Sequence, residues 1–148
     1  MYIFESKLVI DKPIYEVFEF FCKAENLQKL TPPTLNFKIL SELPIEMKKG
    51  SRINYRIKLY GVPVIWKTEI TKWDPPFEFE DTQLKGPYKL WKHRHIFKDL
   101  GDKTEMTDIV EYNPKGFPFN TILDKLIVKK EIEKIFNYRT EKINQYFK

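Results

Sequence analysis

The sequence of 148 residues has little of what many small-protein sites are built from: one cysteine, two histidines and five glycines. The single cysteine, Cys22, cannot form an intramolecular disulfide or a cysteine-based zinc finger. No run of 18 apolar residues is present, which argues against a membrane-spanning helix. The chain also lacks the glycine motifs of dinucleotide, P-loop and α/β-hydrolase sites, so the sequence gives no support for nucleotide binding by those folds or for α/β-hydrolase activity.

Aromatic residues are abundant instead. There are 12 Phe, 8 Tyr and 3 Trp, and 42% of the chain is hydrophobic, which is typical of a folded protein and not of a disordered one. The length suits a single domain, residues 1–148. The strict alternation near the N-terminus does not resemble the apolar core of a signal peptide, so we expect a soluble, cytoplasmic protein.

The charges do not point to a polyanionic partner. The net charge of +5 comes from 26 basic and 21 acidic residues, and the basic ones are scattered or mixed with acids, as in 129–134. That pattern is typical of a solvated surface carrying both signs. We therefore expect no nucleic-acid partner and no integral membrane association.

The hydrophobic pattern predicts an α+β fold. Period-two alternation predicts a strand at the N-terminus and about six antiparallel strands in the middle of the chain, and helical spacing predicts two short helices after the first strand and one long C-terminal helix. Six strands with one apolar face need a cover, and the last helix is long enough to supply it. The predicted strands are 2–10, 37–41, 52–59, 64–70, 77–85, 90–99 and 103–112, and the predicted helices are 14–21, 25–30 and 122–146.

Four sequence pieces resemble a known family. Residues 79–83 (FEDTQ), 86–88 (GPY), 91–97 (WKHRHIF) and 107–112 (TDIVEY) are similar to motifs of the SRPBCC superfamily, the START-like and birch-pollen-allergen-like helix-grip domains. They are most similar to a bacterial and archaeal branch described as ligand-binding or cyclase/dehydrase-like. The resemblance covers the whole chain. It implies a curved antiparallel sheet of six or seven strands wrapped around the C-terminal helix, with a cavity between them, but fold alone does not fix function.

Strand parity places polar residues among the aromatic ones. A two-residue turn at Gly101-Asp102 would set His95 opposite Asp108, and the preceding hairpin would set Asp81 opposite His93 or His95. Since alternate residues of a strand share a face, these side chains all point inward. The pattern predicts an inward polar cluster of Asp81, Gln83, His93, His95 and Asp108. A histidine paired with a carboxylate is expected to favour the charged imidazolium.

Three interpretations of this cluster remain open. It is purely structural, it orients a ligand in an aromatic pocket, or it performs catalysis or binds a metal. In an enzyme, His93 or His95 would be the general acid/base, oriented by Asp81 or Asp108. With only two histidines and no third soft ligand nearby, we expect no metal and no cofactor, and Cys22 is expected to belong to the core.

Ligand binding is the function we favour. We expect a hydrophobic or amphipathic small molecule, lipid-like, aromatic or polyketide-like, to lie between the sheet and the C-terminal helix of a monomer or homodimer. A cyclase- or dehydratase-type enzyme is the alternative. The predicted ligand-binding residues are Tyr55, Trp66, Phe79, Asp81, Gln83, Trp91, His93, His95, Asp108 and Phe136.

Overall fold

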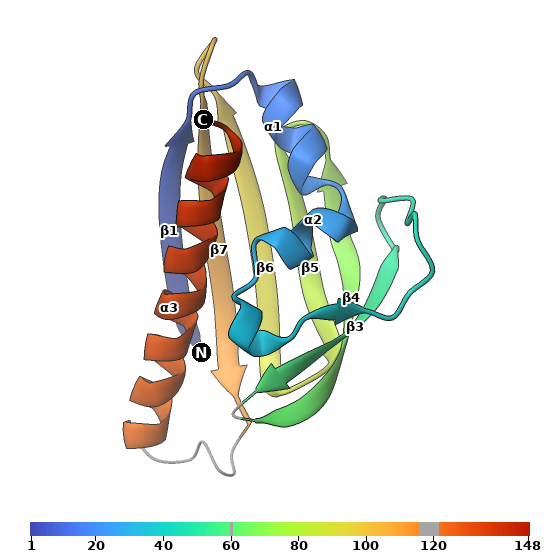
Figure 1. Cartoon of the computed structure of the whole chain (residues 1–148), viewed down its shortest axis with the longest axis vertical. Coiled ribbons are helices and arrows are strands. Elements are labelled where there is room, and N and C mark those ends of the chain that lie inside the picture. The colour runs from blue at the N-terminus through green and yellow to red at the C-terminus, as the bar shows by residue number, and fades with distance from the viewer. Residues whose placement is uncertain (60, 116–121) are drawn as a thin grey trace.

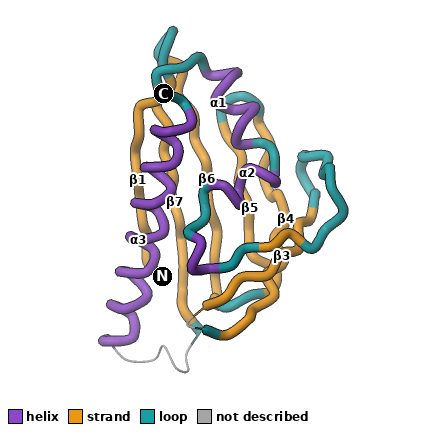
Figure 2. The backbone as a smooth tube through the Cα atoms, in the orientation of Figure 1, coloured by secondary structure: helices purple, strands orange, loops and turns teal. Residues whose placement is uncertain are grey.

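The computed structural model describes residues 1–59, 61–115 and 122–148, with side chains described from 125 onward in the last segment. Its elements follow the predicted order (Figures 1 and 2). The strands are β1 (Tyr2–Ile10), β2 (Lys38–Ile39), β3 (Arg52–Leu59), β4 (Val62–Asp74), β5 (Glu78–Lys85), β6 (Tyr88–Asp99) and β7 (Thr104–Pro114). The helices are α1 (Ile14–Phe21), α2 (Ala24–Lys29), a single 3-10 turn η1 (Pro33–Leu35) and α3 (Ile122–Tyr146).

The seven strands form one curved antiparallel sheet in the order β1-β7-β6-β5-β4-β3-β2. Helix α3 runs along one face of this sheet in front of β1 and β7, and α1 and α2 lie on the same face (Figure 1). The predicted α+β, helix-grip architecture is therefore confirmed. In the described part of the chain, no helix is both long and apolar enough to cross a bilayer.

Aromatic side chains of α1 join the helices to the sheet. The Phe18 ring contacts Phe79 and Phe97 with centroids 5.8 and 5.3 Å apart, both edge-on. Phe20 contacts Phe147, so the end of α3 is fixed against α1. Edge-to-face contacts of buried rings stabilise beyond the area they remove from water. This cluster closes one end of the space between the sheet and α3.

Strand β4 begins earlier than predicted because Pro63 is tolerated inside it. We expected 64–70, but the strand spans Val62–Asp74. Proline has no backbone N–H to donate to a neighbouring strand, so within a sheet it is found where the strand has no neighbour on that side. Pro63 pairs with Lys58 of β3, whereas pairing with β5 begins only at Lys67. The first residues of β4 therefore have a strand on one side only.

The apolar stripe of α3 is displaced from the one that the sequence suggests. Helical spacing predicts a single apolar stripe of Ile122, Leu123, Leu126, Ile127, Ile132, Ile135, Phe136, Ile143 and Tyr146, but Leu126, Ile127 and Tyr146 are 49, 44 and 57% exposed. The prediction for these three residues is wrong, while that for Ile122 and Leu123 falls outside the described side chains. The buried face consists of Val128, Ile132, Phe136, Arg139, Ile143 and Phe147. Steps of four, four, three, four and four residues keep these side chains on one side of the helix.

Candidate functional site

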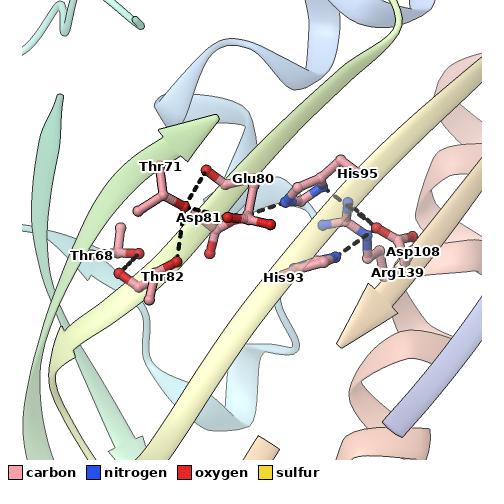
Figure 3. Close-up of polar contacts among 9 residues, drawn as sticks. All are labelled: Thr68, Thr71, Glu80, Asp81, Thr82, His93, His95, Asp108 and Arg139. Atoms are coloured by element: carbon pink, nitrogen blue, oxygen red, sulfur yellow. Dashed lines mark hydrogen bonds and ion pairs between the residues drawn. The ribbon is translucent and has the colours of Figure 1, made fainter. Parts of the chain in front are cut away.

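Three neighbouring strands bring the polar cluster together. Asp81 lies on β5, His93 and His95 on β6, and Asp108 on β7. The register pairs Asp81 with His93 and His95 with Asp108. Both predicted registers are confirmed, and in the β5–β6 hairpin Asp81 lies opposite His93 and not opposite His95. Figure 3 shows the four side chains next to one another across these strands.

The hydrogen bonds of the cluster run diagonally across the ladder. His95 Nε2 lies 2.7 Å from Asp81 Oδ2, and His93 Nε2 lies 2.7 Å from Asp108 Oδ1. Each histidine thus binds the aspartate opposite the other histidine. The two imidazole rings stack between the carboxylates with centroids 3.7 Å apart. The result is two linked His–Asp pairs whose side chains are 6–20% exposed.

Arg139 of α3 completes the cluster, and the sequence analysis missed it. Its guanidinium Nη2 lies 3.5 Å from Asp108 Oδ1, and its Cζ lies 5.3 Å from the Phe21 ring centroid. The signal was available, because Arg139 occurs three residues after Phe136 and four before Ile143, in step with the buried stripe. As a basic residue, Arg139 falls under the expectation of a solvated surface carrying both signs, but its apolar stem allows it to lie along the buried face of the helix.

Neighbouring charges and hydrogen bonds lower the pKa of both aspartates despite their burial. Burial raises the pKa of Asp108, but Arg139 and the hydrogen bond and charge of His93 outweigh it, so the pKa lies well below its usual range. Asp81 behaves alike: burial raises its pKa, and the hydrogen bond and charge of His95 bring the net value below normal. Both carboxyls are therefore ionised at neutral pH.

The expectation of a charged imidazolium is wrong for His95. Burial is the largest influence and lowers the pKa of His95 to about 4, with a further lowering from neighbouring His93. The hydrogen bond and charge of Asp81 raise it, but by less. Removing the imidazolium from water costs more free energy than its interaction with one carboxylate recovers. His95 is therefore neutral at pH 7, with its proton on Nε2 because Asp81 can only accept.

A cavity of about 170 Å³ lies between the sheet, α2 and α3. Protein interiors normally hold few voids larger than a water molecule, so this space is a distinct feature of the fold. Most of its wall is apolar. Its wall is formed by Phe21, Lys23, Ala24, Asn26, Leu27, Leu30, Thr31, Leu35, Phe37, Met47, Ile53, Tyr55, Ile57, Leu59, Trp66, Thr68, Ile70, Phe79, Asp81, Tyr88, Trp91, His93, His95, Ile132, Ile135, Phe136 and Arg139.

Most of the predicted ligand-binding residues belong to this wall. Those that do are Tyr55, Trp66, Phe79, Asp81, Trp91, His93, His95 and Phe136. Asp108 does not line the cavity, but it belongs to the polar cluster through its contact with His93. The wall residues of α2 and η1, such as Leu27 and Leu35, were not predicted, because short segments give little periodicity to show which face is buried.

Gln83 does not join the polar cluster, contrary to expectation. Its side-chain amide is occupied by the β5–β6 turn: Nε2 donates to the Tyr88 carbonyl at 2.7 Å, and Oε1 accepts from the Tyr88 backbone N–H at 3.1 Å. Gly86 leaves room for this contact, since a Cβ there would lie 2.5 Å from Gln83 Oε1. Parity placed Gln83 on the correct face, but the turn backbone offers it two partners nearby.

Two further chemical possibilities can be judged from the geometry. Asp81, His93 and His95 each offer a ligand atom, all within 4.8 Å of one another, which is close enough for one metal ion. However, the two ring planes lie 3.7 Å apart by their centroids and are inclined by only 26°, and lone pairs held in such nearly parallel planes do not converge on one ion. Cys22 contacts the core and burial raises its thiol pKa, which makes it a poor nucleophile.

Known structures share this fold. The aromatase/cyclase ZhuI from Streptomyces sp. R1128 is 13% identical, with a TM-score of 0.77 over 98% of this chain and 92% of that one. A START superfamily protein from Mycobacterium smegmatis is 12% identical, with a TM-score of 0.70 over 97% and 98% of the two chains. Ara h 8.0201 is 14% identical, with a TM-score of 0.62 over 96% and 97%. No protein-family model and no curated protein sequence matches the chain.

Proposed function

We propose that this chain, which has the helix-grip fold of the SRPBCC superfamily, binds a hydrophobic or amphipathic small molecule between its sheet and α3. The observation that carries this proposal is the cavity of about 170 Å³ with its mainly apolar wall. An apolar cavity of about 150 Å³ is large enough to bind benzene. A molecule of one or two rings is therefore the expected size of ligand.

The aromatic part of the wall favours a flat ligand. The Trp66 ring stacks on Tyr55 with centroids 5.6 Å apart and meets Trp91 edge-on at 5.4 Å. These rings expose broad, rigid faces that contact a planar molecule at little cost in side-chain entropy. Two of the three tryptophans in the chain thus border the cavity and report on its occupation by fluorescence.

Binding of naphthalene, followed by tryptophan fluorescence and thermal shift, tests the proposal. We expect saturable one-to-one binding and a raised melting temperature, because a ligand that binds only the folded state stabilises it. Ala24→Leu places additional bulk in the wall and is expected to weaken binding at least tenfold. Gln28→Leu adds the same side chain on the exposed side of α2 and is the matched control. Non-saturable binding, or equal affinity in both variants, would contradict the proposal.

A cyclase- or dehydratase-type enzyme is the second candidate. It is supported by the pair of His95 and Asp81, in which the carboxylate orients the ring through Nε2 and leaves Nδ1 without a hydrogen-bond partner, on a residue that lines the cavity. In such a dehydration, Nδ1 would remove a proton next to a carbonyl and pass the same proton to the β-hydroxyl, which would leave as water while the carbon–carbon double bond forms. The neutral state of His95 permits this at pH 7, although its low pKa makes it a weak base.

Dehydration of 4-hydroxy-4-phenylbutan-2-one to the conjugated enone, which is visible by ultraviolet absorbance, tests the enzyme candidate. An enzyme of this type would accelerate the reaction over buffer and lose the acceleration in His95→Gln. A rate equal to that of buffer in the wild-type protein, under conditions where naphthalene binds, would leave binding as the function.

A further inference from the structure

Unpaired polar atoms gather around the cavity. Among the described residues, three buried side-chain nitrogens have no hydrogen-bond partner: Trp66 Nε1, His95 Nδ1 and Arg139 Nε. All three residues belong to the cavity wall. Leaving a buried donor or acceptor unpaired costs folding free energy, and such atoms are rare in native proteins. Their concentration at one cavity indicates that they serve its occupant.

The side chains that carry two of these atoms, His95 and Arg139, meet at Asp108, and we call this place the cavity corner. Asp108 Oδ1 is 3.5 Å from His95 Nδ1 and 3.5 Å from Arg139 Nη2, so both side chains border one carboxylate oxygen (Figure 3). Arg139 Nε–H is a donor. His95 Nδ1 is an acceptor, because Asp81 holds the single ring proton on Nε2. The corner thus offers one donor and one acceptor to the same small group.

The charges of this corner disfavour an anionic ligand group. Asp81 of β5 and Asp108 of β7 are both ionised, His93 of β6 already pairs with Asp108, and Arg139 of α3 is the cation buried among them. The exposed cation of the wall, Lys23, lies 3.8 Å from Glu19 instead. A ligand carboxylate would therefore meet two carboxylates while losing its own hydration.

An uncharged hydroxyl fits these demands, because it accepts one hydrogen bond and donates another. We propose that the ligand of this cavity is a hydrophobic alcohol or phenol whose hydroxyl accepts a hydrogen bond from Arg139 Nε and donates one to His95 Nδ1. This inference rests on the proposed function, since it names the polar group of the molecule that the cavity binds. It assigns Arg139 and His95 to recognition and leaves Asp81 and Asp108 to orient them.

Four probes with the same two-ring body separate the possibilities: naphthalene, 2-naphthol, 2-methoxynaphthalene and 2-naphthoate, titrated at pH 7. We expect 2-naphthol to bind about tenfold more tightly than naphthalene or 2-methoxynaphthalene, since only the hydroxyl both accepts and donates. We expect 2-naphthoate to bind most weakly. Equal affinity of 2-naphthol and 2-methoxynaphthalene, or tightest binding of 2-naphthoate, would overturn the inference while the proposed function stands. Binding of none of the four would overturn both.

Variants of the corner test the assigned residues. His95→Gln keeps an N–H donor for Asp81 but removes the ring acceptor, and Arg139→Met keeps the apolar stem but removes the donor. In each, we expect the preference for 2-naphthol over 2-methoxynaphthalene to disappear, and the ratio of these two affinities is the readout because it does not depend on how the variant binds the ring body. Lys134→Met, at an exposed position of α3, is the matched control and should keep the preference. Circular dichroism checks folding, and if Arg139→Met fails to fold, His95→Gln decides: an unchanged preference there would overturn the assignment.

Discussion

The imidazole rings of His93 and His95 stack with centroids 3.7 Å apart, yet each ring is hydrogen-bonded to a different aspartate. Two rings at this separation cannot both carry a full charge without strong repulsion in a buried setting. The stack therefore makes the pKa of His95 depend on the charge of His93, which lowers it. A proton taken up by His95 changes the charge of the whole cavity corner.

We predict that acid destabilises the fold through His95. The unfolded protein binds a proton at this ring with a pKa near 6.5, whereas the folded protein does so only at about 4. Between these values the unfolded state holds more protons, so the free energy of unfolding falls as the pH falls from 6.5 to 4. The loss from this group is at most about 3 kcal/mol. Urea unfolding at intervals of half a pH unit measures it.

His95→Gln isolates this contribution, because glutamine can donate to Asp81 but does not titrate. We expect the variant to show a shallower fall in unfolding free energy between pH 6.5 and 4 than the wild type. If the two curves run parallel, the histidine is not the group that titrates in this range.

We predict that Asp108 is the most sensitive member of the cluster. It contacts His93 at 2.7 Å and Arg139 at 3.5 Å, and its side chain is 8% exposed. Asp108→Asn leaves the buried guanidinium without a counter-charge, and breaking a buried pair in this way costs roughly 3–5 kcal/mol. Asp81→Asn is expected to cost less, since Asp81 is 20% exposed and does not contact Arg139 directly. Chemical denaturation of both variants, with Asp102→Asn in the exposed turn as control, ranks them.

The sequence was sufficient to predict which backbone positions face one another. Alternation along β5, β6 and β7 and the short turn at Gly101 determine that His95 lies opposite Asp108, because a shift by one residue would turn the apolar side chains outward. The sequence did not reveal the diagonal hydrogen bonds, since these depend on side-chain rotamers and not on register. It also misled on His95, because burial depends on the helix that covers the sheet. Arg139 was missed because residue type was given more weight than its position in the helical stripe.

The displaced stripe of α3 makes a matched pair of substitutions informative. Ile132 is 1% exposed and Ile127 is 44% exposed, although the sequence suggested that both face inward. Ile132→Ala should cost roughly 2–5 kcal/mol, because it removes buried methyl groups and leaves a cavity. Ile127→Ala should change the free energy of unfolding by less than about 1 kcal/mol, as surface substitutions do. Equal losses measured by urea unfolding would mean that the helix is rotated from the orientation described.

The contact between Gly86 and Gln83 gives a prediction that can be tested by a double-mutant cycle. A Cβ at Gly86 would lie 2.5 Å from Gln83 Oε1, which accepts the Tyr88 N–H at 3.1 Å. The Gln83 side chain can swing away, but it then loses both of its hydrogen bonds to the turn. We therefore expect Gly86→Ala to cost about 1–3 kcal/mol, the cost of leaving turn backbone groups unsatisfied.

In the Gln83→Ala background the obstructing atoms are absent, so Gly86→Ala should cost less than about 0.5 kcal/mol, and the two substitutions should be strongly non-additive. Urea unfolding of the four proteins gives the coupling energy directly. Additive losses would mean that Gly86 is required for its own backbone conformation and not for the space it leaves. In that case the two hydrogen bonds of Gln83 would stabilise the turn independently of Gly86. Alanine at position 86 would then require a rearranged backbone in the β5–β6 hairpin.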